Sequence, residues 1–170
     1  MTTLLLVRHG ETDWNAEGRL QGHTDRPLND HGRRQAKALA ERLAGEGADA
    51  IYASDLSRAK ETAEILGTRL GLPVVIDADL REKNWGNWEG LTGDERIHVE
   101  FEGESTQDHR DRVLRAVERI AERHPGQRVV VVTHGGSLRR IQAAVNGVAD
   151  PVIDNCAVWT YQVEAEGRRS

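Results

Sequence analysis

Two histidines, each followed by glycine, come directly after the two most apolar runs of the chain. His9 follows residues 3–7 and His134 follows residues 128–132. Short branched apolar runs of this kind are typical of buried strands. Ligands of open α/β sheets bind beyond the carboxyl ends of the strands, so neighbouring strands would bring both histidines into one crevice. A glycine such as Gly135 lets the backbone approach a ligand, or turn into a helix whose first amides attract anions.

Two arginines belong to the same predicted edge. Arg8 precedes His9, and Arg58 begins the helix after a second strand. Guanidinium groups bind the oxygens of a tetrahedral oxyanion, and an imidazole nitrogen can attack phosphorus. Taken alone, His-Gly is often a turn, and Arg58 could be a solvated or i,i+4-paired helix residue. Two histidines with an acid could also hold a metal ion, but Arg8 would repel a cation, which favours phosphate.

The order of elements predicts the architecture that must position these groups. Apolar runs predict strands at 3–7, 50–53, 74–76, 128–132 and 158–163. Helical spacing predicts helices through 36–43, 59–70, 113–121 and 138–145, and Ser105 with Asp108 forms a candidate capping box before the third. Strands that alternate with helices predict a three-layer α/β/α fold with a mostly parallel sheet. We expect one domain over residues 1–170.

Composition narrows the class of protein. The 170 residues carry 28 acidic and 23 basic side chains, a net charge of −5, with 38% hydrophobic and 30% charged residues. This balance is typical of a soluble globular domain, and the lack of a basic block argues against nucleic acid or a membrane as partner. The apolar runs are too short for a membrane span or a signal segment, so we expect a cytoplasmic protein. A single cysteine, Cys156, excludes an internal disulfide and a multi-cysteine zinc site.

A set of motifs in a fixed order carries a family resemblance over essentially the whole chain. In order, they are Leu-Val-Arg-His-Gly-Glu-Thr at 6–12, Asn15, Gln21-Gly22, Pro27-Leu28, Ser54-Asp55-Leu56-Ser57-Arg58-Ala59, Leu80-Arg81-Glu82, Gly86, Trp88-Glu89-Gly90, Gly103-Glu104-Ser105 and Thr133-His134-Gly135-Gly136. This set resembles the histidine phosphatase superfamily, in its phosphoglycerate mutase-like branch. The resemblance implies the phosphoglycerate mutase-like form of the three-layer fold.

The resemblance also implies a role for each matching residue. His9 is then the nucleophile that becomes phosphohistidine, and Glu82 is the proton donor. The phosphoryl group is bound by Arg8, Arg58 and His134, with Asn15, Gln21 and Gly22 completing the pocket. A carboxyl group can protonate a leaving alkoxide and later deprotonate the attacking water. Without the resemblance, Glu82 would be an ion-pair partner of Arg81 or Lys83 on a loop.

Neither a metal ion nor a cofactor is needed, because the arginines and histidines supply the positive field. Trp14 or Trp85 could line the side of the pocket that holds the leaving group, whereas core packing is expected for Trp88 and Trp159.

The segment after Trp-Glu-Gly separates phosphatase from mutase. The family's mutases carry a lysine and two arginines in a long insertion there. Here residues 91–103 contain one arginine and no lysine, and residues 91–112 hold seven acids against three bases. We expect a short acidic lid at about 91–105 that leaves the pocket open to water and repels a second phosphate. This predicts a phosphomonoester hydrolase of the histidine acid phosphatase type, with broad specificity for small phosphomonoesters of modest charge.

Two other functions stay open at this point. One is a cofactor-dependent phosphoglycerate mutase, and the other is a non-catalytic module that binds phosphorylated ligands. Binding alone needs no nucleophile, so the presence of both histidines, both arginines and Glu82 argues against the module. The sequence does not choose among sugar phosphates, phosphoglycerate derivatives and α-ribazole phosphate as substrate, and it leaves a homodimer open.

Overall fold

The core of the molecule is a five-stranded sheet of order β3-β2-β4-β1-β5. The computed structural model describes residues 1–147 and 151–164. The strands are β1 (Thr2–Arg8), β2 (Ala50–Ala53), β3 (Val74–Ile76), β4 (Arg128–Thr133) and β5 (Val158–Val163). All neighbours pair in parallel except β1 and β5, which are antiparallel. The mostly parallel sheet predicted from the sequence is thus confirmed.

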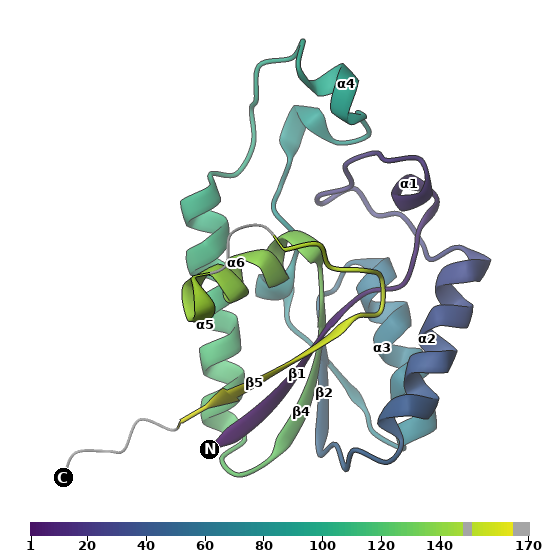
Figure 1. Cartoon of the computed structure of the whole chain (residues 1–170), viewed down its shortest axis with the longest axis vertical. Helices are drawn as coiled ribbons and strands as arrows, with labels where there is room; N and C mark the ends of the chain where they lie inside the picture. The colour runs from purple at the N-terminus through teal and green to yellow at the C-terminus, as the bar shows by residue number, and fades with distance from the viewer. Residues whose placement is uncertain (148–150, 165–170) are drawn as a thin grey trace, which may run out of the picture.

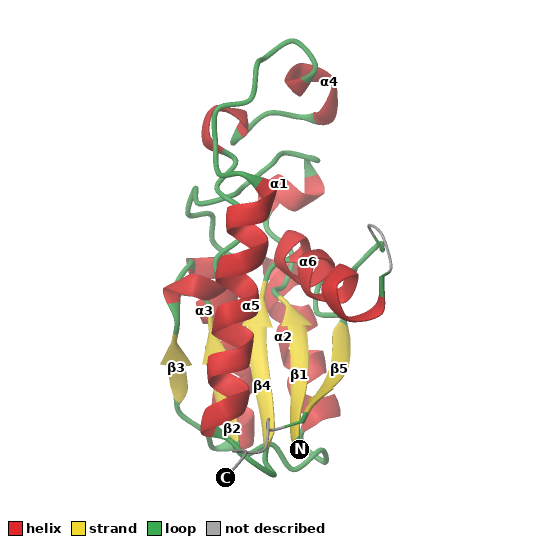
Figure 2. Cartoon of the chain, turned by 90° about the vertical axis from the view of Figure 1, so that its left-hand side faces the viewer, coloured by secondary structure: helices red, strands yellow, loops and turns green. Residues whose placement is uncertain are grey.

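Helices cover both faces of the sheet (Figure 1). One face carries α2 (Asp30–Leu43) and α3 (Ser57–Leu70), and the other carries α5 (Thr106–Arg123) and α6 (Gly135–Asn146). Figure 2 shows α5 and α6 in front of the strands, with α2 behind. Along β1, Leu4 and Leu6 pack in one apolar core and Leu5 and Val7 in the other. A strand buried on both faces needs apolar residues at every position, which explains the unbroken runs.

Short elements were missed by the sequence reading. They are α1 (Asp13–Ala16), α4 (Gly93–Arg96) and the 3-10 helices η1 (Ala78–Leu80) and η2 (Gly86–Trp88). Both α1 and α4 begin at a threonine in a capping box, Thr12 and Thr92 respectively. A single turn is too short to show helical periodicity, so only its cap signals it. The cap predicted at Ser105 is present, since its hydroxyl accepts from the Asp108 amide at 3.0 Å.

The register of β1 and β4 places the two His-Gly sequences side by side. Arg8 pairs with Thr133, so His9 and His134 leave the sheet at the same level. The segment with α4 projects from the molecule beyond this edge (Figure 1).

The first turn of α2 supports the chain that follows His9. A Cβ atom at Gly32 would lie 2.1 Å from the carbonyl oxygen of Glu11, and one at Gly10 would lie 2.6 Å from the carbonyl oxygen of Gly32. The amide of Gly10 donates to Oγ1 of Thr62 in α3 at 3.1 Å. Backbone-to-backbone contact therefore fixes the loop after the first histidine.

We predict that Gly32→Ala lowers the free energy of unfolding by about 1–3 kcal/mol, because backbone atoms cannot move aside as flexible side chains do. Urea denaturation measures this change. Gly45→Ala is the matched control, since a Cβ atom there meets nothing within 4 Å. Equal stability of the two variants would contradict the tight packing of α2 against the loop.

Candidate active site

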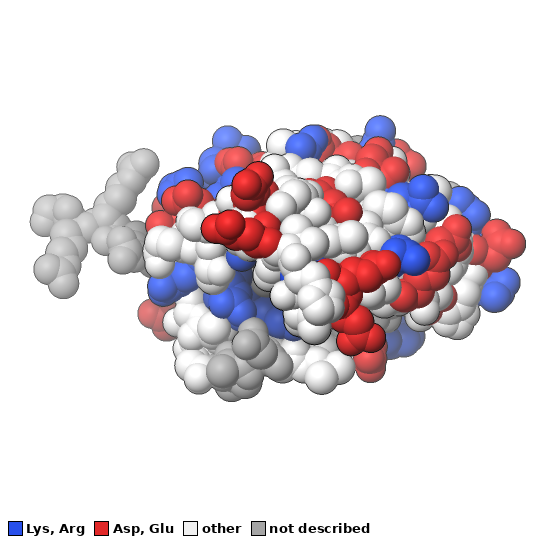
Figure 3. Space-filling model, turned by 90° about the horizontal axis from the view of Figure 1, so that it is seen from above, with Lys and Arg blue, Asp and Glu red and all other residues white. Residues whose placement is uncertain are grey.

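A cavity of about 210 Å³ opens at the carboxyl edge of β1 and β4. Its lining residues are Arg8, His9, Asn15, Arg19, Leu20, Gln21, Gly22, Arg58, Glu82, Trp85, Gly135, Gly136 and Arg139. Seen from above, basic side chains lie in a hollow of this face, with acidic side chains on the surface around it (Figure 3). Eight of the nine predicted site residues line the cavity. The ninth, His134, lies directly behind, with its ring centroid 5.1 Å from that of His9.

His9 is held as a neutral imidazole with one free nitrogen. Its Nδ1 lies 2.7 Å from the carbonyl oxygen of Gly10. Because a carbonyl can only accept, Nδ1 carries the proton and Nε2 keeps its lone pair. Burial, with the nearby charges of Arg58 and Arg8, holds the pKa of His9 well below its ordinary value. The ring is therefore a neutral imidazole at neutral pH, and its Nε2 lone pair is chemically able to act as a nucleophile.

The chain before β5 fixes the position of His9 from the other side. Nδ2 of Asn155 and the amide of Cys156 both donate to the carbonyl oxygen of His9, at 3.1 and 3.3 Å. The carbonyl of Ile153 accepts from the Arg8 guanidinium. The sequence reading missed this loop, because nothing in its composition indicates that it folds back onto the first motif.

Arg58 is buried and Arg8 is half-buried, and main-chain carbonyls anchor both guanidinium groups. Arg58 is 1% exposed and donates to the carbonyls of Thr24 and Gly22 at 3.0 and 2.6 Å. Burial lowers the pKa of Arg58 to about 10 and also lowers that of Arg8. Because Arg58 still carries its charge at pH 7, anchoring turns it into a fixed positive group rather than a mobile surface side chain. The solvated or helix-paired alternative for Arg58 is thus wrong.

Three buried nitrogens of this cluster have no hydrogen-bond partner among the described residues. They are Nε of Arg8, Nε of Arg58 and Nδ1 of His134. On its other side, His134 places Nε2 2.9 Å from Oγ of Ser54. A buried donor without a partner costs about 1–3 kcal/mol, and an anion would supply the acceptors that these nitrogens lack.

Hydrogen bonds from neighbouring groups orient the side-chain amides of Gln21 and Asn15. The hydroxyl of Thr12 donates to Oε1 of Gln21 at 2.7 Å, and the Thr12 amide donates to Oδ1 of Asn15 at 3.1 Å. Nδ2 of Asn155 lies 3.3 Å from the same oxygen of Asn15. With their oxygens engaged, both residues have NH₂ groups left to donate into the cavity.

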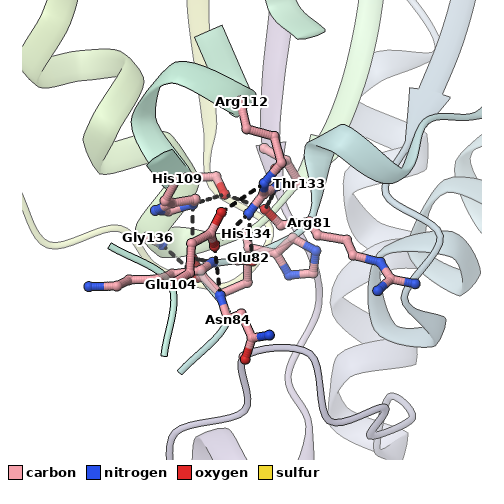
Figure 4. Close-up of polar contacts among 12 residues, drawn as sticks. Arg81, Glu82, Asn84, Glu104, His109, Arg112, Thr133, His134 and Gly136 are labelled. Atoms are coloured by element: carbon pink, nitrogen blue, oxygen red, sulfur yellow. Dashed lines mark hydrogen bonds and ion pairs between the residues drawn. The ribbon is translucent and has the colours of Figure 1, made fainter. Parts of the chain in front are cut away.

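Glu82 is held at the cavity wall by backbone amides (Figure 4). Its Oε1 accepts from the Lys83 amide and its Oε2 from the Gly136 amide, both at 2.8 Å. A Cβ atom at Gly136 would lie 2.3 Å from Oε1, so a side chain at this position would displace the carboxylate. The ion pair predicted as an alternative does not form, because Arg81 pairs with Asp55 at 2.6 Å and Nζ of Lys83 donates to Thr106.

Arg112 of α5 holds the main chain on both sides of Glu82. Its guanidinium donates to the carbonyls of Arg81 and Glu82 at 2.9 and 3.1 Å and pairs with Glu104 at 2.9 Å (Figure 4). The Glu82 carbonyl also lies 2.9 Å from Nε2 of His23. The loop that carries Glu82 is therefore fixed by main-chain contacts from two directions.

His109 is a buried contact of Glu82 that the sequence reading missed. It is 2% exposed, and its Nε2 lies 3.6 Å from Oε1 of Glu82 and 2.9 Å from Oγ of Ser137. The hydroxyl of Ser137 donates to the Arg81 carbonyl, so its oxygen accepts from His109. Its helical spacing could have indicated that it is buried, because His109 lies four residues before Val113 on the apolar face of α5.

The environments of the tryptophans differ in part from those expected from the sequence. Trp85 lines the cavity, whereas Trp14 packs against Gly90 with the guanidinium carbon of Arg26 5.1 Å from its ring centroid. Trp88 is not in the sheet core; it stacks on Trp85 and donates to the Val99 carbonyl. Core packing is right for Trp159, which lies against the cluster beneath α5 and α6.

The acids of the segment 91–105 do not face the cavity. None of its residues belongs to the described lining. Glu95 pairs with Arg19 and Glu104 with Arg112. The repulsion expected from an acidic lid therefore has no geometric basis at the phosphoryl pocket.

The chain belongs to the histidine phosphatase superfamily, branch 1, whose family model matches residues 4–169. Solved structures of similar sequence share the fold, and the family resemblance predicted from the motifs is confirmed.

Particular relatives include phosphatases. The chain is 44% identical over 160 residues to a metal-independent phosphoserine phosphatase of Arabidopsis thaliana, covering 83% of this chain and 67% of that protein. Among solved structures, Bacillus stearothermophilus YhfR superposes with a TM-score of 0.87 at 37% identity, over 96% of this chain and 92% of that one. A mycobacterial glucosyl-3-phosphoglycerate phosphatase superposes with a TM-score of 0.83 at 33% identity, over 93% and 91%.

No group of three or more His, Cys, Asp or Glu side chains within residues 1–147 and 151–164 could hold a metal ion. No helix in this part of the chain is long and apolar enough to cross a membrane.

We predict that His109 makes the fold sensitive to acid. Burial lowers its pKa from 6.5 to about 4 in the folded state, so only the unfolded chain binds this proton between those values, and stability is lost as pH falls through that range. His109→Gln should reduce the loss of unfolding free energy between pH 7 and pH 5 by about 2 kcal/mol. Urea denaturation at both pH values measures it.

The control for this prediction is His98→Gln, at an exposed position. A pH dependence that is the same in His109→Gln and in the wild type would contradict the role of His109.

Proposed function

We propose that the protein is a metal-independent phosphomonoesterase that hydrolyses small phosphate esters through a phosphohistidine on His9. The observation that carries this proposal is the neutral His9 imidazole, which lines one cavity with the anchored guanidinium groups of Arg8 and Arg58 and whose Nε2 bonds to no described residue. The unpartnered nitrogens of Arg8, Arg58 and His134 supply the donors that phosphoryl oxygens need. The phosphatases among its relatives support the same reaction type.

In the first step, the Nε2 lone pair attacks phosphorus and the bond to the ester oxygen breaks. The carboxyl group of Glu82, in the same cavity, delivers its proton to the leaving oxygen, so an alcohol departs and Glu82 becomes a carboxylate. His9 now carries the phosphoryl group on Nε2 and a positive charge on the ring. The Gly10 carbonyl, which accepts from Nδ1–H, stabilises that charge.

In the second step, water enters the position that the alcohol leaves. The Glu82 carboxylate takes a proton from this water, and the water oxygen attacks phosphorus. The bond from Nε2 to phosphorus breaks and its electron pair returns to His9. Inorganic phosphate leaves, and both residues regain their starting protonation states.

The first prediction concerns the covalent intermediate. Incubation with a ³²P-labelled phosphomonoester, followed by quenching without acid, should leave acid-labile and base-stable label on the wild type and none on His9→Ala. Peptide mapping locates the label. His31→Ala, at an exposed position, is the control and should label like the wild type. Label on any residue other than His9 would contradict the mechanism.

The second prediction concerns the proton donor. Glu82→Gln should lower kcat/KM for alkyl phosphates at least tenfold more than for aryl phosphates, because a phenolate leaves with little protonation. Glu102→Gln, an exposed residue of the projecting segment, is the matched control. If both substrate classes lose the same factor in Glu82→Gln, Glu82 is not the general acid.

A further inference from the structure

His109 is a buried titratable group that the proposed mechanism does not use. Its side chain is 2% exposed on the apolar face of α5 and lies close to both Glu82 and Ser137. Burial lowers its pKa to about 4, so the ring is neutral at pH 7. A polar ring costs more to bury than an apolar side chain of the same size. What His109 contributes therefore lies in the groups that it contacts.

Ser137 fixes the tautomer of His109. The Ser137 hydroxyl donates to the carbonyl oxygen of Arg81 at 3.1 Å, so its oxygen is left to accept from Nε2 of His109 at 2.9 Å. In a neutral imidazole, one ring nitrogen carries a proton and the other carries a lone pair. The proton of His109 is therefore on Nε2, and this nitrogen also lies 3.6 Å from Oε1 of Glu82.

The two carboxyl oxygens of Glu82 have different surroundings (Figure 4). Oε1 accepts from the Lys83 amide at 2.8 Å and also has Nε2–H of His109 beside it, at a distance where the contact is electrostatic rather than a hydrogen bond. Oε2 accepts from the Gly136 amide at 2.8 Å. N–H groups stabilise a negative charge on an oxygen and oppose a proton there. Oε1, which two N–H groups approach, is therefore the less favourable oxygen for the acidic proton.

The neighbours of His109 on α5 hold the chain around Glu82. One turn earlier, Oγ1 of Thr106 accepts from Nζ of Lys83 at 3.1 Å. One turn later, Arg112 donates to the Glu82 carbonyl at 3.1 Å. The same helix thus fixes the main chain and carries the ring that faces the carboxyl group. The packing of α5 therefore sets the distance between Nε2 of His109 and Oε1 of Glu82.

We propose that His109 is a positioning residue for Glu82: its Nε2–H keeps the acidic proton on Oε2 and stabilises the carboxylate that forms once this proton has moved to the leaving oxygen. The inference rests on the proposed function, because it assigns a role within general acid catalysis by Glu82. The proton balance of the two steps is unchanged. Glu82 still gives its proton to the leaving oxygen and takes one from water, and His109 stays neutral throughout.

Two substitutions separate the N–H group from the volume of the ring. His109→Phe keeps a planar ring and removes the donor, whereas His109→Gln keeps an N–H group near the position of Nε2 and cannot titrate. We expect His109→Phe to lower kcat/KM for alkyl phosphates about fivefold more than for aryl phosphates, because a phenolate leaves with little protonation. In His109→Gln, the ratio of the two kcat/KM values should stay within about twofold of that of the wild type.

The control for packing is Val117→Ala, because Val117 lies farther along the same buried face of α5. This variant should leave the alkyl-to-aryl ratio unchanged. In a Glu82→Gln background, His109→Phe should not change the ratio further, because no acidic proton is left to place. Equal losses for both substrate classes in His109→Phe, or no recovery in His109→Gln, would overturn the inference and leave the phosphatase mechanism intact.

A measurement without turnover separates this inference from the proposed function. The ¹⁵N chemical shifts of the His109 ring at pH 7 show which nitrogen carries the proton, and we expect Nε2. The Nε2–H proton resonance should shift in Glu82→Gln, because an amide then replaces the carboxyl group beside it, and should stay in place in Glu102→Gln.

A proton on Nδ1, or an Nε2–H resonance that Glu82→Gln leaves unchanged, would overturn the role of His109 even in an active enzyme. If no phosphomonoester is hydrolysed, the proposed function fails, and the same spectra still decide whether His109 acts on Glu82.

Discussion

The parallel pairing of β1 with β4 is the constraint on which the site depends. Arg8 lies opposite Thr133, so the two His-Gly turns leave the sheet together and their imidazoles meet edge to face. A shift of register by one residue would reverse which side chains face each core, and both strands are buried on both faces. The packing of the sheet therefore fixes the distance between His9 and His134, because the core holds both strands in place.

Electrostatics decides what this rigid edge can do. Two guanidinium groups and two imidazoles are gathered in a buried space, and mutual repulsion together with desolvation keeps both rings neutral. The cost of burying the guanidinium groups of Arg8 and Arg58 is offset partly by three backbone carbonyls from two loops. Among the described residues, Nε of Arg8, Nε of Arg58 and Nδ1 of His134 have no hydrogen-bond partner, and the proposed phosphoryl ligand would supply acceptors to them.

A second layer of contacts joins Glu82, the proposed proton donor, to the rest of the fold. Glu82 is reached by the start of α6 through Gly136, by α5 through His109 and Arg112, and by the loop after α1 through His23. Arg139 of the same helix lines the cavity beside Glu82. α6 thus begins beside His9, through His134, and also holds Glu82 through the Gly136 amide.

The sequence by itself determined the layered fold and the residues that gather at its carboxyl edge. Apolar periodicity and the two His-Gly turns are local signals, and local signals suffice for strands that are buried on both faces. Only the tertiary structure decided which groups contact Glu82. The same holds for the contact of Asn155 with His9 and for the placement of Arg139 and Arg140 beside Trp85. These contacts join segments that are far apart in the chain, and their distances depend on helix packing and loop paths. The same reason explains why the acids of residues 91–105 misled the sequence reading: net charge along the chain does not say which side chains pair with arginine and which face a cavity.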